Sequence, residues 1–319
     1  MSSAKSFDPT RDIPSLESKV ILVTGATAGL GKQSVIEFAK HNPAKIWFAA
    51  RSESKARQTI DEVKAALPKN NTTTIEFLQM DLASLASVYK AATKVIQSST
   101  RLDILLNNGG IMAHPAALSE DGYEIQFATN FLGHALLTRL LLPLLSKTST
   151  QSGGSVHNSR LICLSSGSHK RGPAAGIDFS TLNTSADAIN AVERYGQSKL
   201  ANILYAKELA ARYPDVTVAS ANPGMVNTGL TSIMARDSLF YRVALSLARP
   251  IMGVPVEDGV RNQLWAAVSP DVVSGEFYSP VGVTGKGSPL TNDAALRKKL
   301  WDWTQGQLDA FVKKIEAQV

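Results

Sequence analysis

The chain has 319 residues, of which 44% are hydrophobic and 19% charged, an ordinary composition for a globular protein. The net charge of +6 comes from basic residues spread along the chain, which argues against a nucleic-acid partner and favours attraction of a small anionic ligand. A single cysteine, Cys163, excludes an intrachain disulfide, and no stretch is long and apolar enough to predict a membrane span. We therefore expect a cytoplasmic protein.

Short aliphatic runs alternate with longer amphipathic stretches along the chain. The runs predict strands at residues 19–24, 45–50, 74–79, 102–106, 159–165 and 216–221. The stretches between them predict helices at residues 31–40, 54–66, 84–98, 122–145 and 191–212. This β-α alternation, with strands apolar on both faces, predicts an α/β fold with one doubly wound parallel sheet and helices on both faces.

The remaining segments predict the domain organisation. Residues 1–18 read as an N-terminal arm, either flexible or covering the domain, and residues 19–319 as a single domain. Residues 148–159 are polar and predict a mobile loop, while 167–192 form a longer linker. Residues 225–255 lack strand-helix order, and the apolar spacing in 239–247 predicts a lid over a pocket.

The first predicted strand runs into Gly25-Ala26-Thr27-Ala28-Gly29-Leu30-Gly31. Glycines between a strand and a helix let the backbone approach a ligand closely, and the helix N-terminus offers N–H groups and partial positive charge to a pyrophosphate. The spacing is G-x-x-x-G-x-G rather than the common G-x-G-x-x-G. A purely structural tight turn is the alternative, but its place after the first strand favours dinucleotide binding.

The second predicted strand ends at Arg51, where this fold faces the adenosine ribose. An acid there would accept bonds from the 2′-hydroxyl, whereas the planar guanidinium of Arg51 suits a phosphate. Lys32, just past the glycine turn, adds charge. Arg51 could instead be an ordinary solvated charge, but the absence of an acid favours NADP(H) over NAD(H).

Tyr195 and Lys199 lie four residues apart and so share one helix face. A tyrosine with its ordinary pKa near 10 is a poor acid-base catalyst at neutral pH, and we expect the nearby ammonium to lower that pKa. The spacing alone arises often by chance. It gains weight from Ser165-Ser166 at the end of the preceding strand, because strand ends and the following helices converge at the ligand crevice.

From residue 19 onward the chain resembles the classical short-chain dehydrogenase/reductase superfamily, with a Rossmann-type fold. The matching residues, in chain order, are Thr24–Gly31, Asp81-Leu82, Asn107-Asn108-Gly109-Gly110, Asn130, Ser165-Ser166, Tyr195 with Lys199, and Pro223-Gly224. The run Tyr195–Asn202 and the pair Gly31-Lys32 look most like the retinol-dehydrogenase-like branch.

The resemblance implies a catalytic tetrad of Asn130, Ser166, Tyr195 and Lys199, with Asn130 holding a water that links Lys199 to solvent. It implies cofactor contacts at Gly25, Thr27, Gly29, Leu30, Gly31, Lys32, Arg51, Asp81, Leu82, Asn107, Gly109, Tyr195, Lys199, Pro223, Gly224, Val226 and Thr228. Gly109 stands where the family usually has alanine, which we expect to loosen its loop without removing a chemical group.

The expected activity is hydride transfer between a nicotinamide and a carbonyl or alcohol of a lipophilic small molecule, retinoid-like or from secondary metabolism. A homodimer through the two long helices is possible. The alternative is an NADPH-binding protein with a regulatory or non-redox role, which the retention of both Tyr195 and Lys199 disfavours. The five histidines lack metal-ligand spacing, so no metal is expected, and His114 and His169 are expected in surface loops.

Overall fold

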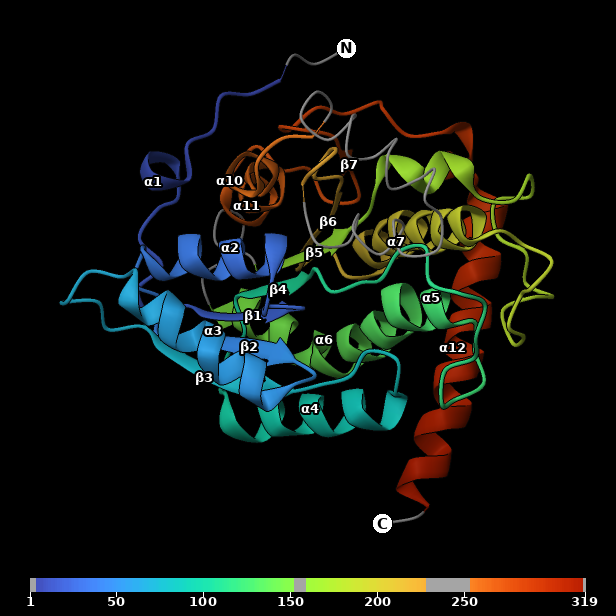
Figure 1. Cartoon of the computed structure of the whole chain (residues 1–319), viewed down its shortest axis with the longest axis horizontal. Helices are drawn as coiled ribbons and strands as arrows, with labels where there is room; N and C mark the ends of the chain where they lie inside the picture. The colour runs from blue at the N-terminus through green and yellow to red at the C-terminus, as the bar shows by residue number, and fades with distance from the viewer. Residues whose placement is uncertain (1–3, 152–158, 228–252, 318–319) are drawn as a thin grey trace, which may run out of the picture.

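The computed structural model describes residues 4–151, 159–227 and 253–317. Its strands are β1 (Val20–Thr24), β2 (Lys45–Ala50), β3 (Thr74–Gln79), β4 (Ile104–Asn107), β5 (Arg160–Leu164), β6 (Thr217–Ala221) and β7 (Phe277–Tyr278). They form one parallel sheet in the order β3-β2-β1-β4-β5-β6-β7 (Figure 1), which confirms the predicted fold class. The strand order reverses between β1 and β4, and ligands of such sheets bind at that switch point.

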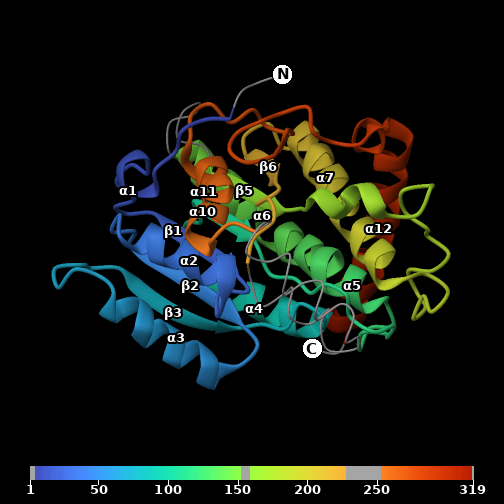
Figure 2. The same ribbon diagram turned by 45° about the horizontal axis from the view of Figure 1, so that its top comes forward.

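Two apolar cores form, one on each face of the sheet. The helices are α1 (Pro9–Asp12), α2 (Gly29–Ala39), α3 (Glu53–Ala65), α4 (Leu85–Ser98), α5 (Ile125–Phe127), α6 (Gly133–Gln151), α7 (Ala191–Arg212), α10 (Val256–Gly259), α11 (Arg261–Val268) and α12 (Ala294–Glu316). Successive side chains of β1 alternate between the cores: Ile21 packs with α2, α3 and α11, the face turned forward in Figure 2, and Leu22 packs with α4, α6, α7 and α12.

The helix predicted at 122–145 is longer and contains a π-helical turn. After α5 the π turn η1 covers Ala128–Leu132, and α6 continues to Gln151. The predicted loop at 148–159 is therefore wrong for residues 148–151, and residues 152–158 lie outside the described part. Ser149 Oγ and Ser159 Oγ lie 2.9 Å apart, which ties the end of α6 to the start of β5.

By length and composition, residues 125–151 would pass as a membrane-spanning helix. However, 78% of their most apolar window is buried inside the protein, as in the core helix of a globular domain. Cys163 is also buried, as the sequence predicts.

The N-terminal arm packs against the domain over its described residues 4–18. Phe7, Ile13 and Leu16 are buried in the same core as α2 and α11. The Lys5 amide donates to the Val281 carbonyl at 2.9 Å. The expectation of a flexible arm is therefore wrong for these residues, and the covering alternative holds because three of their apolar side chains are buried in that core.

The C-terminal helix α12 lies across α7 and reaches α6 (Figure 1). Trp301 of α12 stacks on Tyr205 of α7 with ring centroids 5.4 Å apart, and Arg139 of α6 pairs with Asp309 of α12. Helix α12 of the same chain therefore occupies part of the surface that α6 and α7 could offer to a homodimer.

A buried ion pair holds the segments around the start of α7. Arg194 donates to Glu124 at 2.8 Å and to the His114 carbonyl at 2.9 Å, and the side chains of both ion-pair partners are at most 3% exposed. The Glu124 amide donates to the Leu182 carbonyl. The pair thus joins the loop after β4, the 167–192 linker and the helix that carries Tyr195.

We predict that Arg194→Met lowers the free energy of unfolding by about 3–5 kcal/mol, because Glu124 would remain buried without its partner. The matched control is Arg57→Met, whose pair with Glu53 is 72% and 52% exposed and which should lose less than about 1 kcal/mol. Denaturant unfolding measures both, and equal losses would contradict the prediction.

Candidate active site

The turn after β1 has no room for side chains at Gly25 and Gly31. Gly25 has a φ of +64°, and a β-carbon at Gly31 would lie 2.3 Å from the Gly25 carbonyl oxygen. The N-cap of α2, Ala28, makes no side-chain cap bond, so the first amides of α2 have no side-chain acceptor there. Thr27, Gly29 and Leu30 lie at this helix start. The backbone can therefore cradle a pyrophosphate.

The loop after β4 is bonded to the end of β1. The amides of Asn108 and Gly109 both donate to Thr24 Oγ1, at 2.9 and 2.8 Å. Asn107, expected to line the cofactor cleft, instead turns its side chain into the core and donates to Thr138 of α6 at 2.9 Å. Asn107 therefore anchors α6, and Gly109, two residues further on, contacts the glycine turn.

The charged residues expected around the adenosine differ in their availability. Arg51, at the end of β2, is exposed, and no carboxylate pairs with it in the described residues. Lys32 is not free, because its ammonium lies 2.5 Å from Glu62. Asp81 accepts a bond from the Ala83 amide, and Leu82 beside it is buried. Arg51 is thus the available phosphate ligand of this set.

Tyr195, Lys199 and Ser166 come together at the carboxyl ends of β5 and β6. Lys199 Nζ lies 5.6 Å from the centre of the Tyr195 ring and donates to the Leu164 carbonyl at 3.1 Å. Ser166 Oγ accepts from the Ser168 amide, so its own hydrogen can still donate, and it interacts with the Tyr195 hydroxyl. Its neighbour Ser165 is buried and bonds the Lys199 carbonyl, so Ser166 is the serine that faces Tyr195.

Burial controls the titration of this pair. Desolvation raises the pKa of Tyr195 to about 12, and the Ser166 hydroxyl offsets part of that rise. Desolvation also lowers the pKa of Lys199 to about 8. The expected lowering of the tyrosine pKa by the ammonium is therefore wrong here, because Lys199 points to the Leu164 carbonyl and burial outweighs its charge.

Asn130 lies in the π turn and braces the loop after β4. Its Oδ1 accepts from the Ile111 amide at 2.7 Å, and its Nδ2 donates to the Ile111 carbonyl at 2.9 Å and to Ser198 Oγ at 3.0 Å. Both amide hydrogens are thus engaged. The side chain positions the loop and α7, and any water that Asn130 holds would use its main-chain carbonyl or the second lone pair of Oδ1.

Asn222, which the sequence analysis did not single out, organises the end of β6. Its Oδ1 accepts from the amides of Gly167, at 3.3 Å, and Gly224, at 3.0 Å, and so joins the serine loop to the loop that carries Pro223. Val226 packs on Gly259, where a β-carbon would lie 2.4 Å from it. Thr228 and the predicted lid at 239–247 lie outside the described residues.

Comparison with known proteins now adds the family. The family model described as short chain dehydrogenase matches residues 19–181. This chain is a short-chain dehydrogenase/reductase. It is 38% identical over 309 residues to the short-chain dehydrogenase/reductase drtF of Aspergillus calidoustus, covering 93% of this chain and 95% of that one. It is 34% identical to mouse retinol dehydrogenase 14 (90% and 85% covered), which confirms the retinol-dehydrogenase-like branch.

Among solved structures, an uncharacterized protein of Mycobacterium paratuberculosis matches with a TM-score of 0.73 and 27% identity, over 96% of this chain and 98% of that one. The cofactor of the family is a nicotinamide dinucleotide, NAD(H) or NADP(H). The glycine turn and the uncapped start of α2 in this short-chain dehydrogenase/reductase fit such a group.

Two histidines of this short-chain dehydrogenase/reductase are buried beside the site. His169, expected in a surface loop, is 2% exposed, and its Nδ1 lies 2.7 Å from the Ser166 carbonyl. His134 is 4% exposed and contacts Thr24. In the described residues, no three His, Cys, Asp or Glu side chains are placed to hold a metal.

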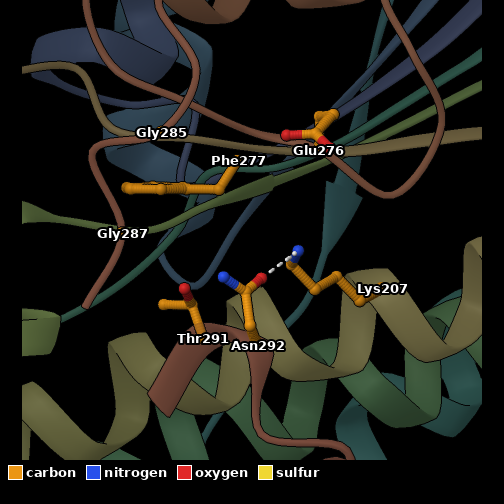
Figure 3. Close-up of a pocket in the computed structure, with 7 residues that line it drawn as sticks. All are labelled: Lys207, Glu276, Phe277, Gly285, Gly287, Thr291 and Asn292. Atoms are coloured by element: carbon orange, nitrogen blue, oxygen red, sulfur yellow. Dashed lines mark hydrogen bonds between the residues drawn. The ribbon is translucent and has the colours of Figure 1, made fainter. Parts of the chain in front are cut away.

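A separate pocket of about 190 Å³ lies between α7, β7 and the 3-10 turn η3 (Pro289–Asn292), as Figure 3 shows. Lys207 in its wall donates to Asn292. Lys207 follows Tyr195 by twelve residues on α7, about 18 Å along the helix axis. Tyr195 does not line this pocket, which is therefore distinct from the group of Ser166, Tyr195 and Lys199.

We predict that Lys199→Met raises the melting temperature at pH 7 while abolishing turnover. Below pH 8 the buried ammonium destabilises the folded state, and this effect diminishes as the pH rises from about 8 toward the ordinary lysine value of 10.5. The stability gain should shrink over the same range in thermal unfolding scans. The exposed Lys90→Met is the control; a melting temperature below wild type at pH 7 would reject the argument.

Proposed function

We propose that this short-chain dehydrogenase/reductase transfers a hydride between NADP(H) and a carbonyl or alcohol of a lipophilic small molecule. The observation that carries the proposal is the grouping of Ser166, Tyr195 and Lys199 at the carboxyl ends of the strands. The loop that contacts the glycine turn also reaches this group, because a β-carbon on Gly110 would lie 3.6 Å from Lys199 Nζ. The retention of Tyr195 and Lys199 favours catalysis over the alternative of a regulatory, non-redox dinucleotide-binding protein.

The preference for NADP(H) rests on Arg51. Its guanidinium is exposed at the strand end that faces an adenosine ribose, with no ion partner in the described part of the chain. A planar guanidinium with several N–H donors can form bidentate hydrogen bonds to a 2′-phosphate. The amides at the start of α2 would hold the pyrophosphate, and Lys199 would bond the nicotinamide ribose.

Tyr195 and Ser166 supply the acid-base chemistry. When bound, the nicotinamide donates the hydride to a carbonyl carbon, or accepts it in the reverse direction. The raised pKa of Tyr195 keeps its hydroxyl protonated at neutral pH, so it can give its proton to the oxygen of a carbonyl. Ser166 Oγ accepts from the Ser168 amide through a lone pair, so its hydroxyl hydrogen can donate to the same substrate oxygen. Oxidation in the reverse direction needs the deprotonated hydroxyl of Tyr195, so its rate should rise with pH.

The lipophilic character of the substrate is supported by the surroundings of the site and by the likeness to retinol dehydrogenase 14. The loops that follow β4 and β6 present Met112, Leu118 and Met225. Leu118 is 49% and Met225 56% exposed, although both are large apolar side chains. Apolar side chains on the loops at the strand ends favour an apolar substrate.

We predict that Tyr195→Phe lowers kcat for carbonyl reduction by at least about 100-fold, because the proton donor is lost. NADPH affinity, measured by fluorescence titration, should stay close to wild type. Tyr213→Phe, at the end of the same helix, is the control and should keep its activity. Full turnover in Tyr195→Phe would remove the assignment, and a panel of lipophilic aldehydes and ketones followed by NADPH absorbance would identify the substrate.

We predict that Arg51→Asp shifts the ratio of kcat/KM for NADPH over NADH by about 10- to 100-fold toward NADH. The variant loses a charge-assisted contact worth about 1.5–3 kcal/mol and adds a repulsive carboxylate. Lys90→Asp makes the same charge change at an exposed position on α4 and should not alter the ratio. An unchanged ratio in Arg51→Asp would show that the 2′-phosphate is not bound there.

A further inference from the structure

The proposed chemistry gives no role to the imidazole of His134, which is buried beside the site. It lies one helical turn after Asn130, on α6, and is 4% exposed. Its Nδ1 lies 3.1 Å from the main-chain oxygen of Asn130, and its Nε2 lies 2.9 Å from Thr24 Oγ1. The ring therefore bridges the end of β1 and the π turn.

Hydrogen-bond accounting fixes the tautomer of this ring. A threonine hydroxyl has one hydrogen and two lone pairs, and both lone pairs of Thr24 are taken by the amides of Asn108 and Gly109. The Thr24 hydrogen can go to His134 Nε2 at 2.9 Å or to the more distant Leu106 carbonyl at 3.5 Å. The other side of the imidazole decides, because Nδ1 faces a carbonyl oxygen that can only accept, so Nε2 is the acceptor. The proton of the neutral ring is then on Nδ1, which donates to Asn130.

These bonds form a closed hydrogen-bond network around the loop after β4. Thr24 holds the loop at Gly109, and Asn130 holds it at Ile111 through two side-chain bonds. His134 fixes Thr24 and Asn130 relative to each other. A β-carbon on Gly25 would lie 2.7 Å from Gly109, so this hydrogen-bond network contacts the glycine turn directly.

The same set of hydrogen bonds also extends to Tyr195. Asn130 Nδ2 donates to Ser198 Oγ, and the Ser198 hydroxyl donates to the Tyr195 carbonyl at 2.7 Å. Burial and the nearby Lys199 charge lower the pKa of His134 to about 4. The neutral form that the bonds require is therefore maintained at neutral pH.

We propose that His134 is a positioning residue that couples the nucleotide-binding turn, through Thr24, to the placement of Asn130 and Tyr195. Because part of its effect is on turnover, the proposal rests on the proposed function. The two nitrogens of the ring act on different steps: the Nε2 bond supports the loop beside the glycine turn, and the Nδ1 bond supports the π turn.

Two substitutions test the Nε2 bond and the Nδ1 bond separately. His134→Gln places its amide near the former Nε2 and keeps the Thr24 bond, so we expect kcat to fall about tenfold with a change in NADPH Kd below about threefold. His134→Asn places its amide near the former Nδ1 and keeps the Asn130 bond, so we expect Kd to rise about tenfold and kcat to fall less than in His134→Gln. His41→Gln, at a histidine bonded to Pro9, is the control.

The opposed pattern of Kd and kcat distinguishes positioning from a merely structural role. Equal changes in both variants, or none, would overturn the proposal. The NADPH Kd can be measured without turnover, so the role of the bond to Thr24 is tested even if the enzyme reduces no substrate. A failure to reduce any substrate would reject the proposed function but not this role of His134. Should both variants fail to fold, ¹⁵N NMR of the wild-type histidines decides: the Nδ1-protonated ring at pH 7 is expected, and an Nε2-protonated or charged His134 would overturn the proposal.

Discussion

The contact between the turn after β1 and the loop after β4 is the constraint on which the rest of the structure depends. A β-carbon on Gly25 would lie 2.7 Å from the Gly109 Cα, and one on Gly31 would lie 2.3 Å from the Gly25 oxygen. In the sheet, β1 lies beside β4 at the point where the order of the strands reverses. Both loops therefore meet where a dinucleotide must bind, with backbone rather than side chains at the surface.

Helix α7 carries a buried charge, the ammonium of Lys199. Lys199 is buried with an ammonium that donates to one carbonyl, that of Leu164, in the described residues. Such burial disfavours the charged form and the folded state. Two neighbouring bonds fix the helix against the strand end: Ser165 donates to the Lys199 carbonyl, and Asn202 donates to the same Leu164 oxygen. The site is thus held by polar bonds to the strand end and not by apolar packing alone.

Features set by local pattern could be predicted from the sequence, and features set by distant contacts could not. The strands at 45–50 and 74–79 and the helix at 191–212 match the structure residue for residue, because each has its own apolar periodicity and caps. Strand β7 has two residues and is defined by pairing with β6. The arm at 4–18 is ordered by a core formed far along the chain. Likewise, His134 and Arg194 show their roles only when their partners are in place.

Gly109 shows how one departure from a family pattern is resolved by its neighbours. Glycine in place of the usual alanine was expected to loosen the loop. A β-carbon there would lie 2.6 Å from Leu82 Cδ1, so the Leu82 side chain fills the space that an alanine methyl would need. The Gly109 amide is also bonded to Thr24, which His134 holds in turn. The loop is therefore fixed by packing from one side and by hydrogen bonds from the other, and the glycine fits a leucine at the expected adenine position.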